Sequence, residues 1–346
     1  MAQPIRFGIL GCARIARKVS RAIKLSPNAT IVAVGSRSAE KARRFIDDNG
    51  LPDNTRAHGT YESLLDDPEV DAVYVPLPTS LHLRWATAAA RKGKHVLLEK
   101  PTALCVAELD QILEACEANN VQFMDGTMWM HHPRTAKMRD LLRDSDLFGQ
   151  LKMVSSIACF LAEPDFLQNN IRANPELDAL GALGDIGWYC IRMILWSADY
   201  RMPRTALALP NPAKTEVGVL LSCGASLHWD DGTVATFYCS FLAHRTFEVA
   251  VVGSKATLTL SDFINPLQEN SARFTFGSTD HVVPTELPQE VCMISEFSRL
   301  VGAVRDNSGS KPDKRWPSIA RKTQAVLDAV KASFDEGFQP IQIAAN

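Results

Sequence analysis

The feature that most constrains the fold lies near the start of the chain, where a short apolar run meets a turn of small residues. Ile5–Leu10 has the composition of a buried strand, and it is followed directly by Gly11-Cys12-Ala13-Arg14-Ile15-Ala16. Gly11 permits a tight strand-to-helix turn, a small residue at 13 permits close approach to a pyrophosphate, and Ala16 permits close helix packing. The turn predicts a Rossmann-type dinucleotide site at a helix N-terminus, whose N–H groups face phosphates. The alternative is a tight turn that binds nothing.

Short apolar runs alternate with helical patterns up to about residue 126. The expected strands after the first are Thr30–Gly35, Ala72–Val75, His95–Glu99 and Val121–Asp125. The expected helices are Ile15–Leu25, Ala39–Asp48, Tyr61–Leu65, Leu81–Lys92 and Ala107–Asn119. Strands and helices that alternate in this way form parallel βαβ units with right-handed crossovers. We therefore predict an α/β fold with an NAD(P)-binding Rossmann domain in residues 1–126.

The pattern changes after about Met128. A helix is still expected at Thr135–Arg143, but the later strands are longer and their residues alternate. These strands are Val217–Trp229, Thr233–Leu242, Phe247–Val252 and Ala256–Leu260, with turns at residues 230–232 and 253–255 that favour a meander. Helical patterns return at Gln289–Asp306 and Ser318–Glu336. Residues 127–346 are expected to form a C-terminal α/β domain with a largely antiparallel, open sheet that binds substrate and mediates dimerisation.

Composition excludes several classes of function. The formal net charge of -2 gives no reason to expect nucleic acid or an anionic membrane as a partner. No apolar stretch has membrane-spanning length, and the strand that begins at Ile5 leaves no room for a signal peptide, so we expect a cytoplasmic protein. The eight cysteines form no CxxC pair and no His/Cys metal spacing. They are expected to be buried thiols, and no metal is expected.

The end of the second strand bears on the choice of cofactor. An acidic residue there would bind the ribose 2′-hydroxyl of NAD, whereas this chain has Ser36 and Arg37, with Lys41 one turn further on. A hydroxyl and a guanidinium suit a 2′-phosphate, which arginine binds as a fork. We therefore expect NADP(H) in preference to NAD(H). The alternative is that Arg37 is a solvated loop residue.

The fourth expected strand ends in Glu99-Lys100-Pro101. Ligands of open parallel sheets bind beyond the carboxyl ends of the strands, so Lys100 is expected beside the nicotinamide. Beside a cofactor cation or in a dry pocket, the pKa of a lysine falls and proton exchange becomes feasible. Pro101 fixes the local chain and is a candidate for a cis peptide bond. A lysine at the end of a strand is also an ordinary surface charge, and this tripeptide alone does not decide between the two.

A second polar cluster lies in the glycine-containing stretch Gly181–Tyr189. If a helix begins near Asp185, then Asp185 and Tyr189 are four residues apart and share one face. A carboxylate and a phenol that converge on Lys100 would form an acid–base group for a carbinol–carbonyl pair. The alternative is that Asp185 caps the helix while Tyr189 packs in the core.

The three motifs in this order resemble the glucose–fructose oxidoreductase, inositol dehydrogenase and rhizopine-catabolism (Gfo/Idh/MocA) family over essentially the whole chain. Tyr189, where histidine is commoner, resembles the branch of dimeric dihydrodiol dehydrogenase and D-xylose dehydrogenase. The residues of Val75–His82 and Met124–Trp129 resemble plant members of that branch. Ala13 departs from the family's glycine loop.

The resemblance implies catalytic roles for Lys100 and Tyr189, and an orienting, substrate-binding role for Asp185 together with Tyr189. It implies hydride transfer between NADP(H) and a carbonyl or hydroxyl of a small sugar, polyol, cyclic diol or dicarbonyl. It also implies a homodimer through the C-terminal sheet. The expected cofactor-binding residues are Gly11, Cys12, Ala13, Arg14, Ile15, Ser36, Arg37, Lys41, Pro78, Thr79, His82, Glu99 and Lys100. His82 is equally well read as a helix-start histidine with satisfied hydrogen bonds.

Trp129 and His131 are further expected substrate contacts. They lie in Met128–Pro133, where relatives often carry an arginine before an aromatic residue. Met130 and Trp129 make this wall more apolar than a sugar site requires. Two other functions stay open: a redox-neutral lyase or glycosidase that retains its dinucleotide, and a non-catalytic dinucleotide-binding protein. A net change in NADPH absorbance with substrate identifies the dehydrogenase or reductase.

Overall fold

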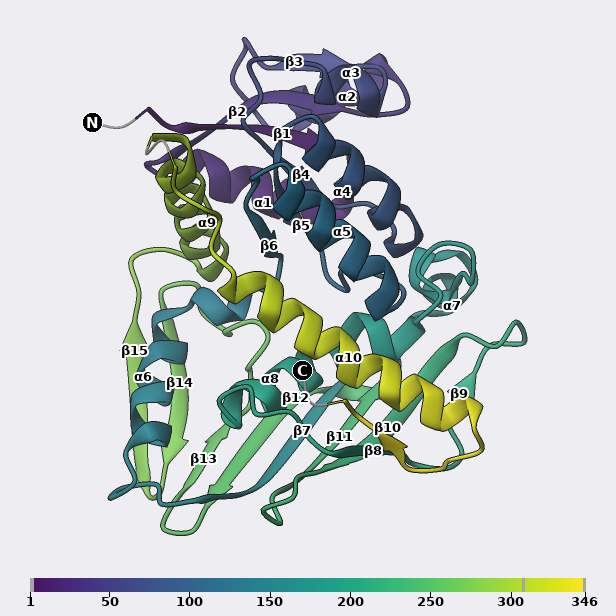
Figure 1. Cartoon of the computed structure of the whole chain (residues 1–346), viewed down its shortest axis with the longest axis vertical. Helices are drawn as coiled ribbons and strands as arrows, with labels where there is room; N and C mark the ends of the chain where they lie inside the picture. The colour runs from purple at the N-terminus through teal and green to yellow at the C-terminus, as the bar shows by residue number, and fades with distance from the viewer. Residues whose placement is uncertain (1–2, 307–308, 345–346) are drawn as a thin grey trace. The chain divides into compact units, whose positions relative to one another are not determined.

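The computed structural model describes residues 3–306 and 309–344, which divide into two compact units (Figure 1). The first unit contains the chain up to Ala103, together with Ala107–His131 and Leu287–Ala320. The second contains Leu104–Val106, His132–Glu286 and the chain from Arg321 onward. Within the described residues, no helix is both long enough and apolar enough to cross a membrane.

The first unit is built on a six-stranded parallel sheet in the order β3-β2-β1-β4-β5-β6. Its strands are β1 (Ile5–Leu10), β2 (Ala29–Gly35), β3 (Arg56–His58), β4 (Ala72–Val75), β5 (His95–Leu98) and β6 (Phe123–Asp125). Its helices include α1 (Arg14–Leu25), α2 (Ala39–Asp48), α3 (Tyr61–Leu65), α4 (His82–Arg91), α5 (Val106–Ala118) and α9 (Gln289–Asp306), with short 3₁₀ turns η1 (Thr79–Leu81) and η2 (Met128–His131). This is the doubly wound order, and its direction reverses between β1 and β4. The expected Rossmann fold is therefore confirmed.

Helix α9 joins the first unit although it lies far along the chain. Its Phe297 ring lies 5.9 Å from the ring of Phe7 in β1. The carbonyl of Ser295 accepts a 2.9 Å hydrogen bond from the side chain of Asn28, just before β2. Aromatic burial of this kind stabilises by several kcal/mol in all, so α9 is part of the core of this unit.

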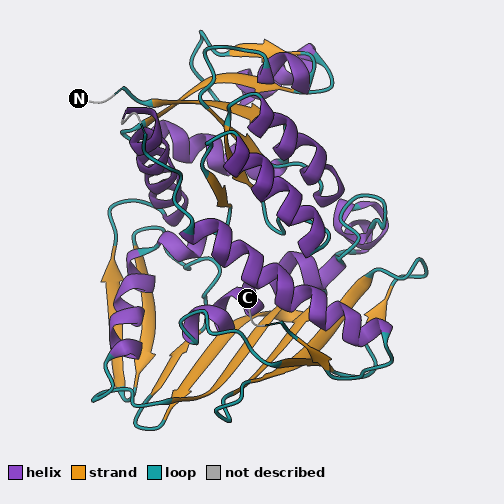
Figure 2. Ribbon diagram, viewed as in Figure 1, coloured by secondary structure: helices purple, strands orange, loops and turns teal. Residues whose placement is uncertain are grey.

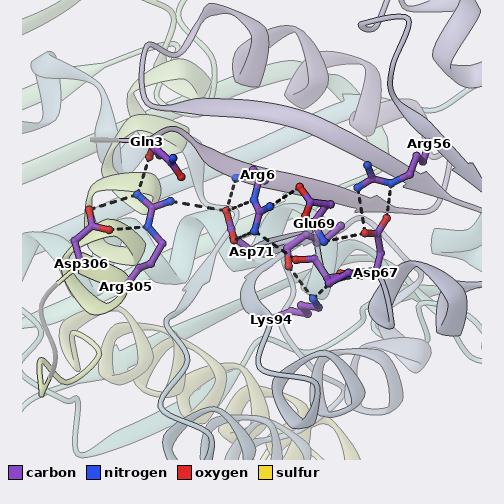
Figure 3. A network of polar contacts seen from close by, with 11 residues as sticks. Gln3, Arg6, Arg56, Asp67, Glu69, Asp71, Lys94, Arg305 and Asp306 are labelled. Atoms are coloured by element: carbon purple, nitrogen blue, oxygen red, sulfur yellow. Dashed lines mark hydrogen bonds and ion pairs between the residues drawn. The ribbon is translucent and has the colours of Figure 1, made fainter. Parts of the chain in front are cut away.

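A polar network fastens the C-terminal end of α9 to the end of the sheet opposite Gly11 (Figure 3). Arg305 donates a 2.7 Å hydrogen bond to the carbonyl of Gln3, and its guanidinium lies 3.8 Å from Asp71. Arg6 binds both carboxylate oxygens of Asp71, at 2.7 and 3.0 Å. Burial alone would raise the pKa of Asp71, but the hydrogen bonds from Arg6 outweigh it and hold that pKa below its usual value. Nearby, buried Lys94 donates to two backbone carbonyls of the loop before β4, both at 2.8 Å.

The second unit is built on a ten-stranded sheet, drawn in orange in the lower part of Figure 2. Its path is β15-β14-β13-β12-β7-β11-β10-β8-β16, and β9 pairs with β10. The strands are β7 (Leu151–Leu161), β8 (Thr205–Ala208), β9 (Ala213–Lys214), β10 (Leu220–His228), β11 (Val234–Ser240), β12 (Leu242–Gly253), β13 (Thr257–Leu260), β14 (Ser271–Phe276), β15 (Thr279–Pro284) and β16 (Ile341–Gln342). The helices are α6 (Pro133–Arg143), α7 (Pro164–Asn169), α8 (Trp188–Ser197) and the later part of α10 (Arg315–Asp335). The expected largely antiparallel sheet is confirmed.

The simple meander predicted for Val217–Leu260 is wrong at one point. Strands β11 and β12 follow one another in the chain but do not pair, because β7 lies between them. β7 is parallel to β11 and antiparallel to β12. The chain passes the end of β7 at Phe241, whose carbonyl accepts a 2.8 Å hydrogen bond from the N–H of Ala162. The two predicted hairpins, β10–β11 and β12–β13, are present.

The two faces of the second sheet differ in what covers them. Helix α8 packs against β7 and β11 on one face. On the other face, Tyr238 is 41% exposed and lies level with Ile157 and Glu248, which are also partly exposed. A cavity of about 520 Å³ opens on this face, with Ile157, Glu248 and Arg273 among its lining residues.

Candidate functional site

The dinucleotide turn occupies the point where the first sheet reverses its direction. Gly11 follows β1 with φ of 106°, in the left-handed region that favours glycine. Its N–H donates a 2.8 Å hydrogen bond to the carbonyl of Gly35 at the end of β2. A Cβ at position 11 would lie 2.9 Å from the side chain of Leu77, in the loop after β4. Only glycine therefore fits where the three strand ends meet, and that is where ligands of doubly wound folds bind.

The start of α1 fits a phosphate group. Arg14 and Ile15 open the helix, and Ala13 is the N-cap with φ of -72° and ψ of 159°. That is ordinary extended backbone, so Ala13 stands where the fingerprint has glycine without conformational cost. Its side chain supplies no cap for the N–H groups of the first turn. These N–H groups and the positive end of the helix dipole suit an anion.

The residues expected to select the cofactor gather at the end of β2. Ser36 is buried beside the turn, whereas Arg37 and Lys41 are exposed cations. The thiol of Cys12 lies 3.7 Å from the carbonyl of Lys41, and burial raises the pKa of this thiol, so Cys12 is neutral at pH 7. A hydroxyl beside two exposed cations matches the chemistry of a 2′-phosphate.

Tyr61 lies against this cluster and was not expected from the sequence. Its hydroxyl lies 3.6 Å from the position that a Cβ of Gly11 would occupy. Burial raises the pKa of Tyr61, and the nearby charge of Arg37 acts in the opposite direction. The ring meets Trp85 edge-on, with 4.9 Å between centroids. The pattern of Tyr61–Leu65 indicated a helical turn but gave no sign that its first residue faces the dinucleotide turn.

Lys100 lies just after β5, where hydrogen bonds to Glu99 fix the backbone. The buried carboxylate of Glu99 accepts a 2.5 Å hydrogen bond from the hydroxyl of Tyr74 and a 3.1 Å bond from the backbone N–H of Lys100. The Lys100–Pro101 peptide bond is cis, and Pro101 was a candidate for such a bond from the sequence. Glu99 and Pro101 are buried, and Lys100 between them is half-buried. Tyr74 is a positioning residue that the sequence did not reveal, because its strand reads as uniformly apolar.

Pro78, Thr79 and His82 lie in the loop after β4 and the helices that follow it. His82 is 1% exposed. Its Nε2 lies 2.8 Å from the carbonyl of Leu77, and its Nδ1 lies 3.2 Å from the carbonyl of Thr102. The imidazole thus joins the strand-end loops after β4 and β5. This geometry favours the interpretation of His82 as a residue that positions the loops.

Trp129 and His131 belong to the first unit rather than to the second. Trp129 is 1% exposed within η2. The ring of His131 stacks on Trp316 near the start of α10, with centroids 4.6 Å apart and planes inclined by 24°. The stacking of His131 on Trp316 is a packing contact, and a role of Trp129 and His131 toward substrate remains a prediction.

Asp185 and Tyr189 are partly exposed residues of an otherwise buried segment in the second unit. Leu183–Gly187 forms a π-helical turn that runs directly into α8, and Tyr189 is the second residue of that helix. Within Gly181–Cys190, every residue is buried except Asp185 and Tyr189. Insertion of a π turn is frequent at functional sites, where it re-aims a side chain. The sequence placed these two residues on one helical face but did not predict the π turn.

Arg172 contacts Asp185 of this pair and was missed by sequence reasoning. Its Nε lies 2.9 Å from Oδ1 of Asp185. The charge of Asp185 raises the pKa of Arg172 further above its usual value, and burial opposes this effect. No sequence signal could have found the contact, because Arg172 lies in a separate 3₁₀ turn (Ile171–Ala173) after α7.

The doubly wound sheet with a dinucleotide turn at its reversal point, combined with an open antiparallel sheet, is the fold of Rossmann-type dinucleotide-binding proteins with an added α/β domain. Residues 5–127 match the model of an oxidoreductase family with an NAD-binding Rossmann fold, GFO/IDH/MocA. Residues 135–259 match the GFO/IDH/MocA C-terminal domain. The chain belongs to this oxidoreductase family.

Several proteins resemble the chain over nearly its whole length. A dTDP-3,4-didehydro-2,6-dideoxy-alpha-D-glucose 3-reductase from Actinomadura kijaniata is 36% identical, over 98% of this chain and 98% of the relative. A D-xylose 1-dehydrogenase (NADP(+)) from Haloferax volcanii is 30% identical, over 96% of this chain and 98% of the relative. The crystal structure of a 3-ketoreductase from Actinomadura kijaniata with NADP and TDP-benzene has a TM-score of 0.81 at 27% identity, covering 95% of this chain and 98% of that one.

Proposed function

We propose that this oxidoreductase transfers a hydride between NADP(H) and a carbonyl or hydroxyl group of a small sugar, polyol, cyclic diol or dicarbonyl. Residues 1–126 would bind the cofactor, and residues 127–346 would bind the substrate and form the dimer. Sugar substrates are favoured because both relatives described above act on sugars, by their names. Tyr189 and the residues of Val75–His82 support a place beside the dihydrodiol and D-xylose dehydrogenases, near their plant members.

The observation that carries the proposal is the exposure pattern of Gly181–Cys190. A phenol and a carboxylate reach the surface from a segment that is otherwise buried. Asp185 pairs with the partly exposed Arg172, so the partial exposure of this carboxylate has a structural explanation as well. A pure core role for Tyr189, however, would bury its ring as completely as that of Trp188, which is 0% exposed.

The residues of this chain would divide the chemistry between them. When bound, NADP(H) supplies or accepts the hydride. Tyr189 would give a proton to the reacting oxygen or take it back, and Lys100 would hydrogen-bond that oxygen and favour the phenolate. Asp185 would orient the substrate. The N–H groups at the start of α1 would hold the pyrophosphate, and Ser36 with Arg37 would hold the 2′-phosphate.

The experiment replaces Tyr189 by phenylalanine, which keeps the ring and removes the hydroxyl. We expect turnover to fall by roughly 10²–10⁴-fold on the best substrate from a panel of sugars, cyclic diols, aldehydes and α-diketones, with little change in NADPH affinity. Lys100→Met should lower turnover at least as much. The matched control is Tyr200→Phe, which removes a phenol hydroxyl from a half-buried tyrosine just after α8 in the same unit. A Tyr189→Phe variant that keeps more than about half of wild-type turnover rules out the acid–base role.

A homodimer through the second sheet is part of the proposal. The face opposite α8 carries Tyr238, Ile157 and Ala250, none of which is buried, and a sheet face that exposes apolar side chains is often covered by a second copy of the chain. Sedimentation at micromolar protein should give twice the chain mass of 38.1 kDa. Replacing Ile157 by aspartate should shift the protein toward the monomer. A wild-type mass equal to that of one chain contradicts the dimer.

A further inference from the structure

Asn170 helps to position the side chain of Arg172 that contacts Asp185. The side-chain oxygen of Asn170 accepts a 3.1 Å hydrogen bond from the backbone N–H of Arg172 and lies 3.4 Å from its Nη1. Asn170 therefore caps the short 3₁₀ turn and directs the guanidinium at the same time. The Nε of Arg172 then reaches Oδ1 of Asp185 at 2.9 Å. The side chain of Asp185 is 12% exposed and that of Arg172 is 35% exposed, so the pair is only partly screened by water.

The titratable groups around Arg172 include both residues of the candidate site in this unit, Asp185 and Tyr189. Asp185 has the largest effect on the pKa of Arg172, and Asp178 and Tyr189 raise it further. Electrostatic coupling between two groups is reciprocal, so the guanidinium also favours the ionised form of Asp185.

We propose that Arg172 is a positioning residue for the proton-transfer step, which it serves by keeping Asp185 ionised and fixed in one orientation beside Tyr189. This inference rests on the proposed function and deepens it. Lysine in place of Arg172 would keep the charge but lose the planar fork, and methionine would lose both. The two substitutions therefore separate charge from orientation.

The first test is a double-mutant cycle on kcat with the full chain and NADPH. Arg172→Met should lower kcat by at least about 10-fold, Arg172→Lys should recover part of the loss, and the NADPH Kd should stay within about twofold. In an Asp185→Asn background, Arg172→Met should cause no further loss, because Arg172 acts through Asp185. The matched control is Arg143→Met, which removes the guanidinium of an exposed 2.8 Å pair with Asp199 in the same unit. Losses that multiply in the double variant overturn the proposal.

The second test does not depend on turnover. The carboxyl carbon signal of Asp185, identified by its absence in Asp185→Asn, is followed by NMR from acid to neutral pH in the wild type and in Arg172→Met. The titration midpoint should rise in Arg172→Met, because the ionised carboxylate loses its cation. An unchanged midpoint overturns the proposal. If the midpoint rises but the wild type shows no NADPH-linked turnover, Arg172 does stabilise the ionised form of Asp185. In that case the proposed function is overturned instead.

Discussion

Replacing Gly181 by alanine tests whether the π turn depends on a close backbone approach. Gly181 has φ of 55° and directly precedes the turn that carries Asp185. A Cβ there would overlap the carbonyl oxygen of Leu220 in β10 and lie 3.0 Å from the carbonyl carbon of the same residue. It would also lie 2.8 Å from Cγ1 of Val219. The oxygen belongs to a strand backbone, which cannot rotate away as a flexible side chain would.

Two costs add in Gly181→Ala. A left-handed alanine costs about 1–2 kcal/mol, and forcing an extra methyl group against packed backbone costs about 1–3 kcal/mol more. The expected loss of unfolding free energy is therefore about 2–5 kcal/mol. The matched control is Gly218→Ala, because Gly218 has φ of 88° and no atom within 4 Å of its would-be Cβ. It should show only the conformational cost of about 1–2 kcal/mol. Alanine restricts the unfolded chain equally in both variants, so that effect cancels in the comparison.

Urea unfolding followed by far-ultraviolet circular dichroism measures both variants under one condition. The same preparations are assayed for turnover, which should fall in Gly181→Ala because Asp185 moves with the turn. If the two variants differ by less than about 0.5 kcal/mol, the close approach at Leu220 does not matter and the reasoning fails.

Three further outcomes follow from the first unit. Wild type should bind NADPH more tightly than NADH, and Arg37→Asp should reverse that order in a fluorescence titration; equal wild-type affinities refute the role of Arg37. Burial lowers the pKa of His95 to about 4, below its ordinary 6.5, so the unfolded chain takes up this proton first. Stability should then fall by up to about 3 kcal/mol as pH drops from 6.5 to 4, and His95→Gln should flatten that part of the urea-midpoint profile. Arg6 and its neighbours hold the pKa of Asp71 below its usual value. The ionised carboxylate of Asp71 therefore adds to the free energy of unfolding at neutral pH, and this contribution is lost as pH falls through the lowered pKa. Asp71→Asn should cost about 2 kcal/mol at pH 7 with a smaller acid-induced loss, and an unchanged acid profile contradicts this.

Local patterns predicted much of the first unit because its strands are buried on both faces. The expected helices Ala39–Asp48, Tyr61–Leu65 and Gln289–Asp306 coincide with α2, α3 and α9. β3 was not predicted, since Arg56–His58 is short, polar and at the sheet edge, where no apolar run is needed. In the second unit, local patterning marked strands and hairpins but gave no information on which distant strand separates β11 from β12.

In the candidate site, too, the sequence identified some residues and missed others. Gly11, Lys100, Asp185 and Tyr189 could be singled out because each sits in a local pattern with a physical reason. Arg172 could not, because its importance comes only from a contact with a residue in another turn. Residues that act through tertiary contacts leave no periodicity or spacing in the sequence.

The return of α9 to the first unit has a consequence for how the chain is made. Phe7, Asn28 and Asp71 each contact a residue of Leu287–Ala320, and this segment is synthesised only after all the strands from β7 to β15. At usual elongation rates, the ribosome needs roughly ten to thirty seconds to cover that interval. During this time the nascent nucleotide-binding half exposes the apolar surface that α9 later covers, which makes it a candidate client for chaperones. For the same reason, a stop codon or a cloning boundary placed before α9 should yield an aggregation-prone fragment rather than an autonomous cofactor-binding module.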